Sequence, residues 1–155
     1  MKNTKTDFNK YFEILGKMFH DTSPFNQIMK MRLENMNGSI GVKIDMREEL
    51  IGNYKKKILH GGVISSIMDV AGGLTVLTNI IQKETNISPE KFQERCFGLA
   101  TINLRIDYLR PGKGEFFLAT GSVLRYGEIV SLVNIKFHNN FKQLIAVGIG
   151  TYMVA

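Results

Sequence analysis

The segment of residues 61–81 is apolar around most of its circumference at helical spacing, yet it contains an aspartate, Asp69. Burying an unpaired carboxylate costs free energy, so Asp69 must be paired, protonated or at the edge of a cavity. A carboxylate at a cavity edge can act as a general base or as a nucleophile. It could equally bind a backbone group or a basic side chain, and residue types alone favour neither role.

His60, Gly61 and Gly62 stand at the start of the same segment. The first N–H groups of a helix have no partner within the helix and lie at its positive end. Two glycines let a ligand approach these donors without a Cβ in the way, and fixed donors stabilise the oxyanion that forms when a carbonyl is attacked. The alternatives are a tight turn for the glycines and a structural hydrogen bond for His60.

The spacing of these two features indicates a dimer. Eight residues separate Gly61 from Asp69, which is ~12 Å along a helix axis at 1.5 Å per residue. One helix therefore cannot bring both groups to the same carbonyl, whereas two antiparallel helices related by a two-fold axis can. A stripe of small residues beside Asp69, namely Ser65, Ser66, Gly72 and Gly73, would permit such a close approach or make room for a ligand.

Length and composition set the wider limits. The chain has 155 residues, which fits a single domain covering residues 1–155. Its one cysteine, Cys96, allows no intrachain disulfide, and no apolar run is long enough for a membrane span. With its polar N-terminus, we expect a cytoplasmic protein without integral membrane association. No metal-ligand cluster or redox-cofactor motif is present, so we expect no metal and no cofactor.

The net charge of +6 favours an anionic partner. The basic residues are spread along the chain, and Lys55–Lys57 is the only run, for which a solvated loop is the default interpretation. Nucleic-acid binding is not expected, because the run lacks an aromatic platform or a recognition helix.

The elements needed to position these residues follow from periodicity. Residues 47–57 have the composition of an exposed loop, and Asn37-Gly38 predicts a hairpin turn. Residues 1–22 predict an amphipathic helix, 61–81 a long central helix and 89–95 a small helix; strands are expected at 30–36, 39–46, 100–108, 116–126, 129–138 and 144–154. This order predicts the α+β class: a curled antiparallel sheet wrapped around one long central helix, the hotdog fold.

Several motifs carry a family resemblance. Leu59-His60-Gly61-Gly62-Val63 followed by Asp69-Val70-Ala71-Gly72-Gly73 resembles the PaaI-like hotdog thioesterases. With Gly52-Asn53, the stretch from Thr101 to Gly112 and Thr151-Tyr152-Met153-Val154, the chain resembles the YigI branch of bacterial acyl-CoA thioesterases.

The resemblance implies hydrolysis of acyl-CoA thioesters to free acid and CoA, with medium- to long-chain fatty acyl groups expected. Asp69 matches the general base or nucleophile, and Gly61 matches the backbone oxyanion donor. Thr101 matches a hydroxyl near the attacking water, although strand alternation groups it with Asn103 and Arg105. Asn53 matches an asparagine near the thioester.

The resemblance also implies a homodimer or a dimer of dimers with shared active sites, in which basic residues at the subunit edge hold the CoA phosphates. The candidates are Arg110, Lys113 and Arg125, with ordinary surface charge as the alternative. Two other functions fit the same fold. One is an acyl-CoA-binding regulator without turnover, against which Asp69 argues. The other is a dehydratase or hydratase that pairs a histidine such as His60 with an acid.

Overall fold

The computed structural model describes residues 4–84 and 86–154. Its helices are α1 (Thr4–Asp21), α2 (Pro24–Met29), α3 (Gly61–Lys83) and α4 (Pro89–Gly98), with a 3-10 turn, η1 (Glu48–Leu50). Its strands are β1 (Arg32–Asn35), β2 (Ile40–Asp45), β3 (Ile51–Asn53), β4 (Ile58–Leu59), β5 (Ala100–Tyr108), β6 (Phe116–Tyr126), β7 (Val130–Asn139) and β8 (Leu144–Met153). The first three residues of the helix expected over 1–22 lie outside the described residues.

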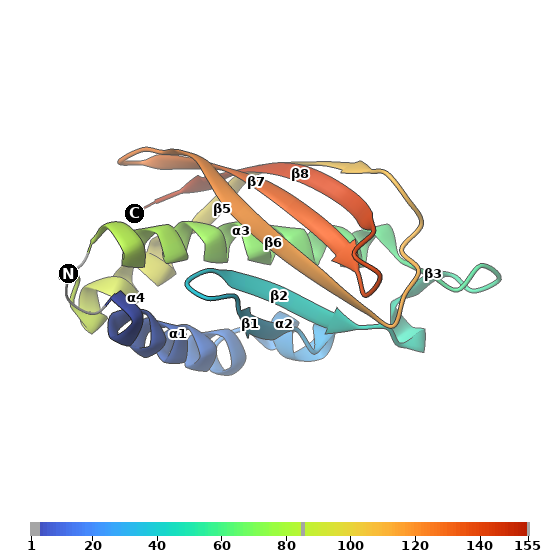
Figure 1. Ribbon diagram of the computed structural model, residues 1–155, viewed down its shortest axis with the longest axis horizontal. Coiled ribbons are helices and arrows are strands. Elements are labelled where there is room, and N and C mark those ends of the chain that lie inside the picture. Colours follow the sequence, from blue (N-terminus) through green and yellow to red (C-terminus); the bar gives the residue numbers. More distant parts are fainter. Residues whose placement is uncertain (1–3, 85, 155) are drawn as a thin grey trace.

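Six strands form one antiparallel sheet in the order β1-β2-β6-β7-β8-β5, and this sheet curls around α3 (Figure 1). α3 is buried on most sides against the inner face of the sheet. The inward side chains of β7, from Ser131 to Phe137 at every second position, are fully buried. The predicted fold, a curled antiparallel sheet around a long central helix, is therefore confirmed.

Local sequence signals account for several element boundaries. Asn37 and Gly38 both have positive φ, at 56° and 102°, as the turn between β1 and β2 requires. Ser88 caps α4 by accepting a hydrogen bond from the Lys91 N–H, and Pro89 occupies the first turn. By length and composition α3 could cross a membrane, but 72% of its apolar window is buried inside the protein, which is typical of a core helix.

The segment 47–57 differs from the exposed loop that its composition predicts. It forms η1 followed by a small hairpin in which β3 pairs with β4. Leu50 and Leu59 anchor the base of this hairpin in the core. The strands have only three and two residues, too few for an alternating pattern to be visible in the sequence.

β5 is the edge of the sheet that matters for the site. It pairs only with β8, so its other edge presents unpaired backbone groups. It is also exposed on both faces, and only Leu104 and Ile106 are half-buried. Its register against β8 shifts between Thr101 and Asn103, which marks a bulge.

Candidate active site

Asp69 lies on α3 with its side chain held but not sealed. The residue is half-buried, and its Oδ1 accepts a hydrogen bond of 2.8 Å from the Thr101 hydroxyl. Among residues 4–84 and 86–154, no cation forms an ion pair with Asp69, and Oδ2 has no hydrogen-bond partner. One carboxylate oxygen is therefore fixed while the other is free to meet water or a substrate.

The bulge in β5 explains why Thr101 faces Asp69. Simple alternation would place Thr101 on the same face as Asn103 and Arg105, away from the helix. The bulge inserts Ile102 as an extra residue, so Thr101 pairs with Tyr152 and shares its inward face. The structure thus places the Thr101 hydroxyl on Asp69, a contact that the alternating pattern does not predict.

Tyr152 of β8 binds the main chain of α3 at Asp69. Its hydroxyl donates a 3.0 Å hydrogen bond to the main-chain oxygen of Asp69. Burial, with a further contribution from the Asp69 charge, raises the pKa of the Tyr152 phenol well above its ordinary value. The phenol therefore stays protonated and remains a donor. Sequence analysis did not assign Tyr152 a role.

Gly72 and Gly73 are packed closely against side chains of their own chain. A Cβ on Gly72 would lie 1.9 Å from the Tyr152 hydroxyl oxygen and 2.7 Å from Ile135 Cδ1, and one on Gly73 would lie 3.0 Å from Leu99 Cδ2. Both glycines are buried. The room that the pair provides is thus taken, within this chain, by the side chains of Tyr152, Ile135 and Leu99.

The start of α3 combines one capped N–H with one free N–H. His60 is the N-cap, and its Nδ1 accepts a 2.8 Å hydrogen bond from the Gly62 N–H. This is the structural role considered for His60 as an alternative to catalysis. A Cβ on Gly62 would lie 2.9 Å from that ring nitrogen, so this glycine makes room for the cap. In the described part of the chain, the Gly61 N–H has no hydrogen-bond partner.

Gly61 is not required by the packing of its own chain. A Cβ at this position would meet nothing closer than the Tyr108 ring at 3.6 Å, an ordinary contact distance. Since glycine in a helix costs up to about 1 kcal/mol relative to alanine, its presence needs another reason. Close approach of a ligand to the free N–H is such a reason.

Tyr108, at the end of β5, lies directly over Gly61. Its hydroxyl donates a 3.1 Å hydrogen bond to the Gly61 carbonyl oxygen, and the residue remains 53% exposed. In the sequence, Tyr108 falls within the stretch from Thr101 to Gly112 that carries the family resemblance. A tyrosine at an inward position of a strand fits the alternating pattern, so nothing in the sequence singles it out.

Ser65 lies between the helix start and Asp69. Its hydroxyl donates to the main-chain oxygen of Gly62 at 2.9 Å, and Ser66 donates to the same oxygen at 2.7 Å. Both hydroxyls are thus satisfied within their own helix. What remains available on this face is a surface of small side chains.

The other expected site residues are not brought to Asp69 within the chain. Asn53 lies in the β3–β4 hairpin, where its Oδ1 accepts a hydrogen bond from the Lys56 N–H at 3.1 Å. Arg110 donates to the Leu144 carbonyl oxygen at 2.9 Å, and Lys113 lies exposed on the turn before β6.

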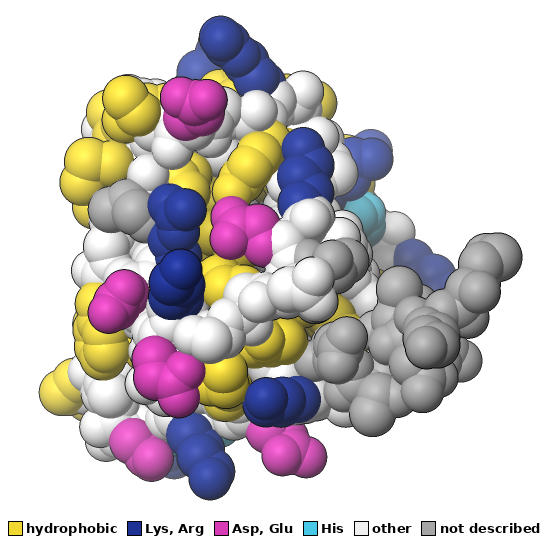
Figure 2. All heavy atoms as spheres, turned by 90° about the vertical axis from the view of Figure 1, so that its left-hand side faces the viewer, with side chains coloured by type: hydrophobic (Ala, Val, Ile, Leu, Met, Phe, Trp, Pro, Cys, Tyr) yellow, Lys and Arg dark blue, Asp and Glu magenta, His cyan; other side chains and the backbone are white. Residues whose placement is uncertain are grey.

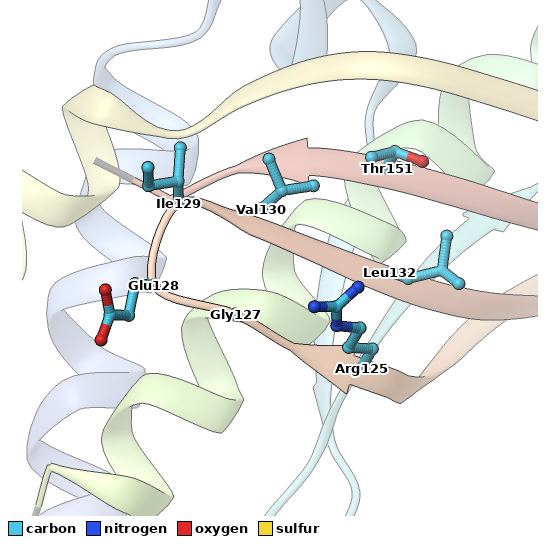
Figure 3. A pocket seen from close by; sticks show the side chains of 7 residues that line it. All are labelled: Arg125, Gly127, Glu128, Ile129, Val130, Leu132 and Thr151. Atoms are coloured by element: carbon cyan, nitrogen blue, oxygen red, sulfur yellow. The ribbon is translucent and has the colours of Figure 1, made fainter.

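Arg125 lies on the opposite face of the sheet from Asp69. It pairs in register with Leu132, which points outward because its neighbours Ser131 and Val133 are buried. Together with Thr151 these residues border a shallow depression of about 450 Å³ beside the β6–β7 turn (Figure 3). This depression does not open towards Asp69.

Two other chemistries have little support among the described residues. No group of three or more His, Cys, Asp and Glu side chains there is arranged to hold a metal ion. Burial raises the pKa of the Cys96 thiol to about 12, so this cysteine is not a ready nucleophile.

Comparison with known proteins agrees with this geometry. A model of the thioesterase superfamily matches residues 56–145, which include the start of α3, Asp69 and β5. The chain belongs to the thioesterase superfamily. The medium/long-chain acyl-CoA thioesterase YigI of Escherichia coli K12 is 38% identical over 143 residues, which cover 92% of each protein. The expectation of a thioester hydrolase is thus confirmed.

Solved structures place the thioesterase fold on the whole chain. A thioesterase-superfamily protein from Shewanella oneidensis superposes with a TM-score of 0.89 at 38% identity, covering 96% of this chain and 97% of its own. The PaaI protein of Escherichia coli superposes with a TM-score of 0.70 at 16% identity, covering 99% and 96%. The predicted resemblance to PaaI-like hotdog thioesterases is confirmed.

Proposed function

We propose that this thioesterase hydrolyses medium- to long-chain fatty acyl-CoA to the free acid and CoA. The whole chain would act as one catalytic domain in the cytoplasm. The observation that carries the proposal is the pairing of a held, accessible carboxylate on Asp69 with a free N–H on Gly61. The name of the relative YigI supports the substrate class.

Each group has a defined task in this reaction. Thr101 holds Asp69 so that its free oxygen either deprotonates the attacking water or attacks the thioester carbon itself. The Gly61 N–H donates to the carbonyl oxygen as it becomes an oxyanion. When Asp69 acts as the base, the CoA thiolate leaves and takes up the proton that Asp69 removed from water. When Asp69 attacks the carbon itself, the thiolate leaves a mixed anhydride on Asp69, and a water molecule then hydrolyses that anhydride, releasing the free acid and supplying the proton. Water, carboxylate and amide suffice, and we propose no metal or cofactor.

The two groups belong to different subunits in this proposal. Asp69 and Gly61 lie ~12 Å apart along one helix, too far to act on one carbonyl. In an antiparallel pair of helices, Gly61 of the partner subunit reaches the level of Asp69 when the two-fold axis crosses α3 at Ser65. The small, internally satisfied surface at Ser65 permits that close approach.

The exposed edge of β5 is compatible with the same axis. Thr101 contacts Asp69 near one end of β5, and Tyr108 contacts Gly61 at the other end. The midpoint between them is Leu104–Arg105, which faces the midpoint of the helix segment, Ser65. Antiparallel pairing of two β5 edges about that point would continue the sheet across a homodimer and cover its unpaired backbone groups.

CoA phosphates would then lie near the edge between subunits. Arg110 and Lys113 are close in sequence to Tyr108 and therefore to the Gly61 donor. Arg125 lies on the outer face of the sheet and could bind CoA only if the substrate also passed that face. We therefore assign it no part in binding the CoA phosphates.

The proposal is tested with Asp69→Asn. This change keeps the size and the Thr101 contact but removes the negative charge. We expect thiol release from acyl-CoA to fall at least about 10³-fold, while the thermal midpoint and the oligomeric state stay the same. Asp107→Asn, on the exposed outer side of β5, is the matched control and should retain full activity. Undiminished hydrolysis by Asp69→Asn would refute the proposal.

A further inference from the structure

The β3–β4 hairpin is a fixed structure attached to the start of α3. Asn53 Oδ1 accepts a hydrogen bond from the Lys56 N–H, and Lys57 has φ 48°, so the tip has a defined backbone. At its base, the His60 N–H donates to the Leu50 carbonyl oxygen at 2.8 Å. The base of the hairpin is therefore joined to the residue that precedes the Gly61 donor.

The packing of Gly52 strengthens this attachment. A Cβ on Gly52 would lie 2.8 Å from His60 Cα, so the two backbones are in direct contact. The hairpin then projects from the body of the protein beyond the start of α3 (Figure 1). The side chains at its tip thus have a fixed position relative to the helix start.

The tip carries an aromatic ring and a run of positive charge. Tyr54 is 78% exposed, and Lys55, Lys56 and Lys57 are all exposed. Within residues 4–84 and 86–154, none of these lysines forms an ion pair. Adjacent like charges repel each other, and an exposed ring adds no packing. The side chains at the tip therefore do not stabilise the fold.

Charge is distributed differently at the other end of the molecule. Figure 2 shows the end that bears α4 and the β6–β7 turn, where basic and acidic side chains are intermixed. The tip of the hairpin therefore differs from that end, because its charges have one sign and stand beside a ring.

An aromatic ring beside several lysines suits a nucleotide. The ring stacks on a base, while the ammonium groups bind phosphates as point charges. The five residue-to-residue steps from Lys56 to Gly61 span at most ~17 Å of extended chain. The tip is thus within reach of a ligand whose reactive end lies at Gly61 and whose phosphates lie at the end of a long arm.

We propose that the β3–β4 hairpin binds the nucleotide part of the CoA substrate, with Tyr54 against the adenine and Lys55–Lys57 on the phosphates. The inference rests on the proposed function, because it takes the thioester to lie at Gly61. It assigns a role to a basic run that sequence alone interpreted as a solvated loop.

The test compares two substrates and two triple variants. In one variant Lys55, Lys56 and Lys57 are changed to Gln. The control variant carries the same change at three exposed lysines elsewhere, Lys17, Lys91 and Lys136. Substrates are an acyl-CoA and the N-acetylcysteamine thioester of the same acid, which lacks the nucleotide.

We expect the hairpin variant to raise KM for the acyl-CoA at least about tenfold with kcat unchanged, and to leave both constants unchanged for the short thioester. In the wild-type protein KM for acyl-CoA should rise with ionic strength, and this dependence should weaken in the hairpin variant. Equal KM values for acyl-CoA in the two triple variants would overturn the inference.

Binding of adenosine 3′,5′-bisphosphate, measured by calorimetry, separates this inference from the proposed function. Tyr54→Ala should weaken it about tenfold, and the lysine variant should weaken it further. If the wild-type protein hydrolyses no thioester, the proposed function fails, whereas these losses of binding would still support the site. Bisphosphate binding that is unaffected by Tyr54 and by the lysines would overturn the hairpin site alone.

Discussion

Gly61 is the residue at which the backbone itself is assigned a chemical role. It is the first residue of α3, a position where proline is well tolerated because its missing N–H has no partner inside the helix. The preceding residue, His60, has φ −65° and ψ 137°, which are the values that a residue before proline adopts. Gly61→Pro therefore removes the N–H donor, and the backbone at this position can accept the proline without a change of fold.

We expect Gly61→Pro to lower kcat about 10²- to 10³-fold, the usual cost of losing one oxyanion donor. Its thermal midpoint should be equal to or above that of the wild type. Gly61→Ala keeps the N–H and adds only a methyl group, so its loss of activity should be smaller. Thiol release and differential scanning calorimetry on both variants check this. A proline variant as active as the alanine variant would show that this N–H is not the donor.

Thr101 tests whether the orientation of the carboxylate matters. Thr101→Val keeps the shape of the side chain and removes the hydrogen bond to Asp69. Because a hydrogen bond to a charged group contributes about 1.5–3 kcal/mol, we expect kcat to fall at least about tenfold. Thr101→Ser, which restores the hydroxyl, should recover most of the activity. If valine and serine behave alike in steady-state assays, Thr101 has no such role.

The sequence predicted some of these residues and not others, for reasons of residue type. Asp69 stands out because a charge is unusual within an apolar helix, and Gly61 because glycines at a helix start let a ligand approach unpaired N–H groups without a Cβ in the way. Tyr108 and Tyr152 could not be found in this way, because an inward tyrosine is ordinary in a strand. The contact of Thr101 depends on a bulge that leaves no mark in the alternating pattern.

At the scale of elements, α3 is held against the sheet by a close contact that only glycine allows. Gly72 lies under Tyr152, which in turn bonds the backbone of Asp69. The sequence pattern of paired glycines indicates a close approach but cannot say to what. A neighbouring helix, a ligand and a ring of the same chain would all require the same small residue. Within this chain the close neighbour is the Tyr152 ring, and the role of the two glycines in substrate binding stays a prediction.

Substitution of this glycine gives a prediction of stability with a matched control. Gly72→Ala would place a methyl group 1.9 Å from the Tyr152 hydroxyl oxygen. Overpacking of this kind costs about 1–3 kcal/mol, so the thermal midpoint should fall by about 3–10 °C. Gly16→Ala in α1 meets nothing within 4 Å and should raise the midpoint instead.

The second variant that checks this explanation is Gly72→Ala combined with Tyr152→Phe. Removing the hydroxyl removes the closest contact, so the double variant should be more stable than the sum of the two single changes implies. Purely additive losses, measured by thermal unfolding, would mean that Gly72 and Tyr152 are not coupled as the packing indicates.

Long elements were predicted well and short ones poorly. α3 and the four strands from β5 to β8 have enough residues for their periodicity to be visible, and their observed boundaries lie within two residues of those expected. The β3–β4 hairpin was expected to be a loop, because its strands have only three and two residues. Its lysines were consequently assigned to solvent, and the proposed ligand site depends on the attachment of the hairpin to α3 as well as on the residues at its tip.

For the whole molecule, the account depends on two subunits that share each site. Asp69 and Gly61 are separated along one helix, and β5, whose outer edge is unpaired in the described chain, contacts the first through Thr101 and the second through Tyr108. A two-fold dimer whose axis crosses α3 at Ser65 has two sites, each with Asp69 from one subunit and Gly61 from the other.

Subunit complementation tests this arrangement most directly. Asp69→Asn and Gly61→Pro, each inactive alone, are co-expressed with different tags, and the heterodimer is isolated by two affinity steps. If sites are shared, one site of the heterodimer has both changes and the other has neither, so its activity should be about half that of the wild type. If each site lay within one chain, both sites of the heterodimer would be damaged, and a heterodimer as inactive as its parents would contradict the account.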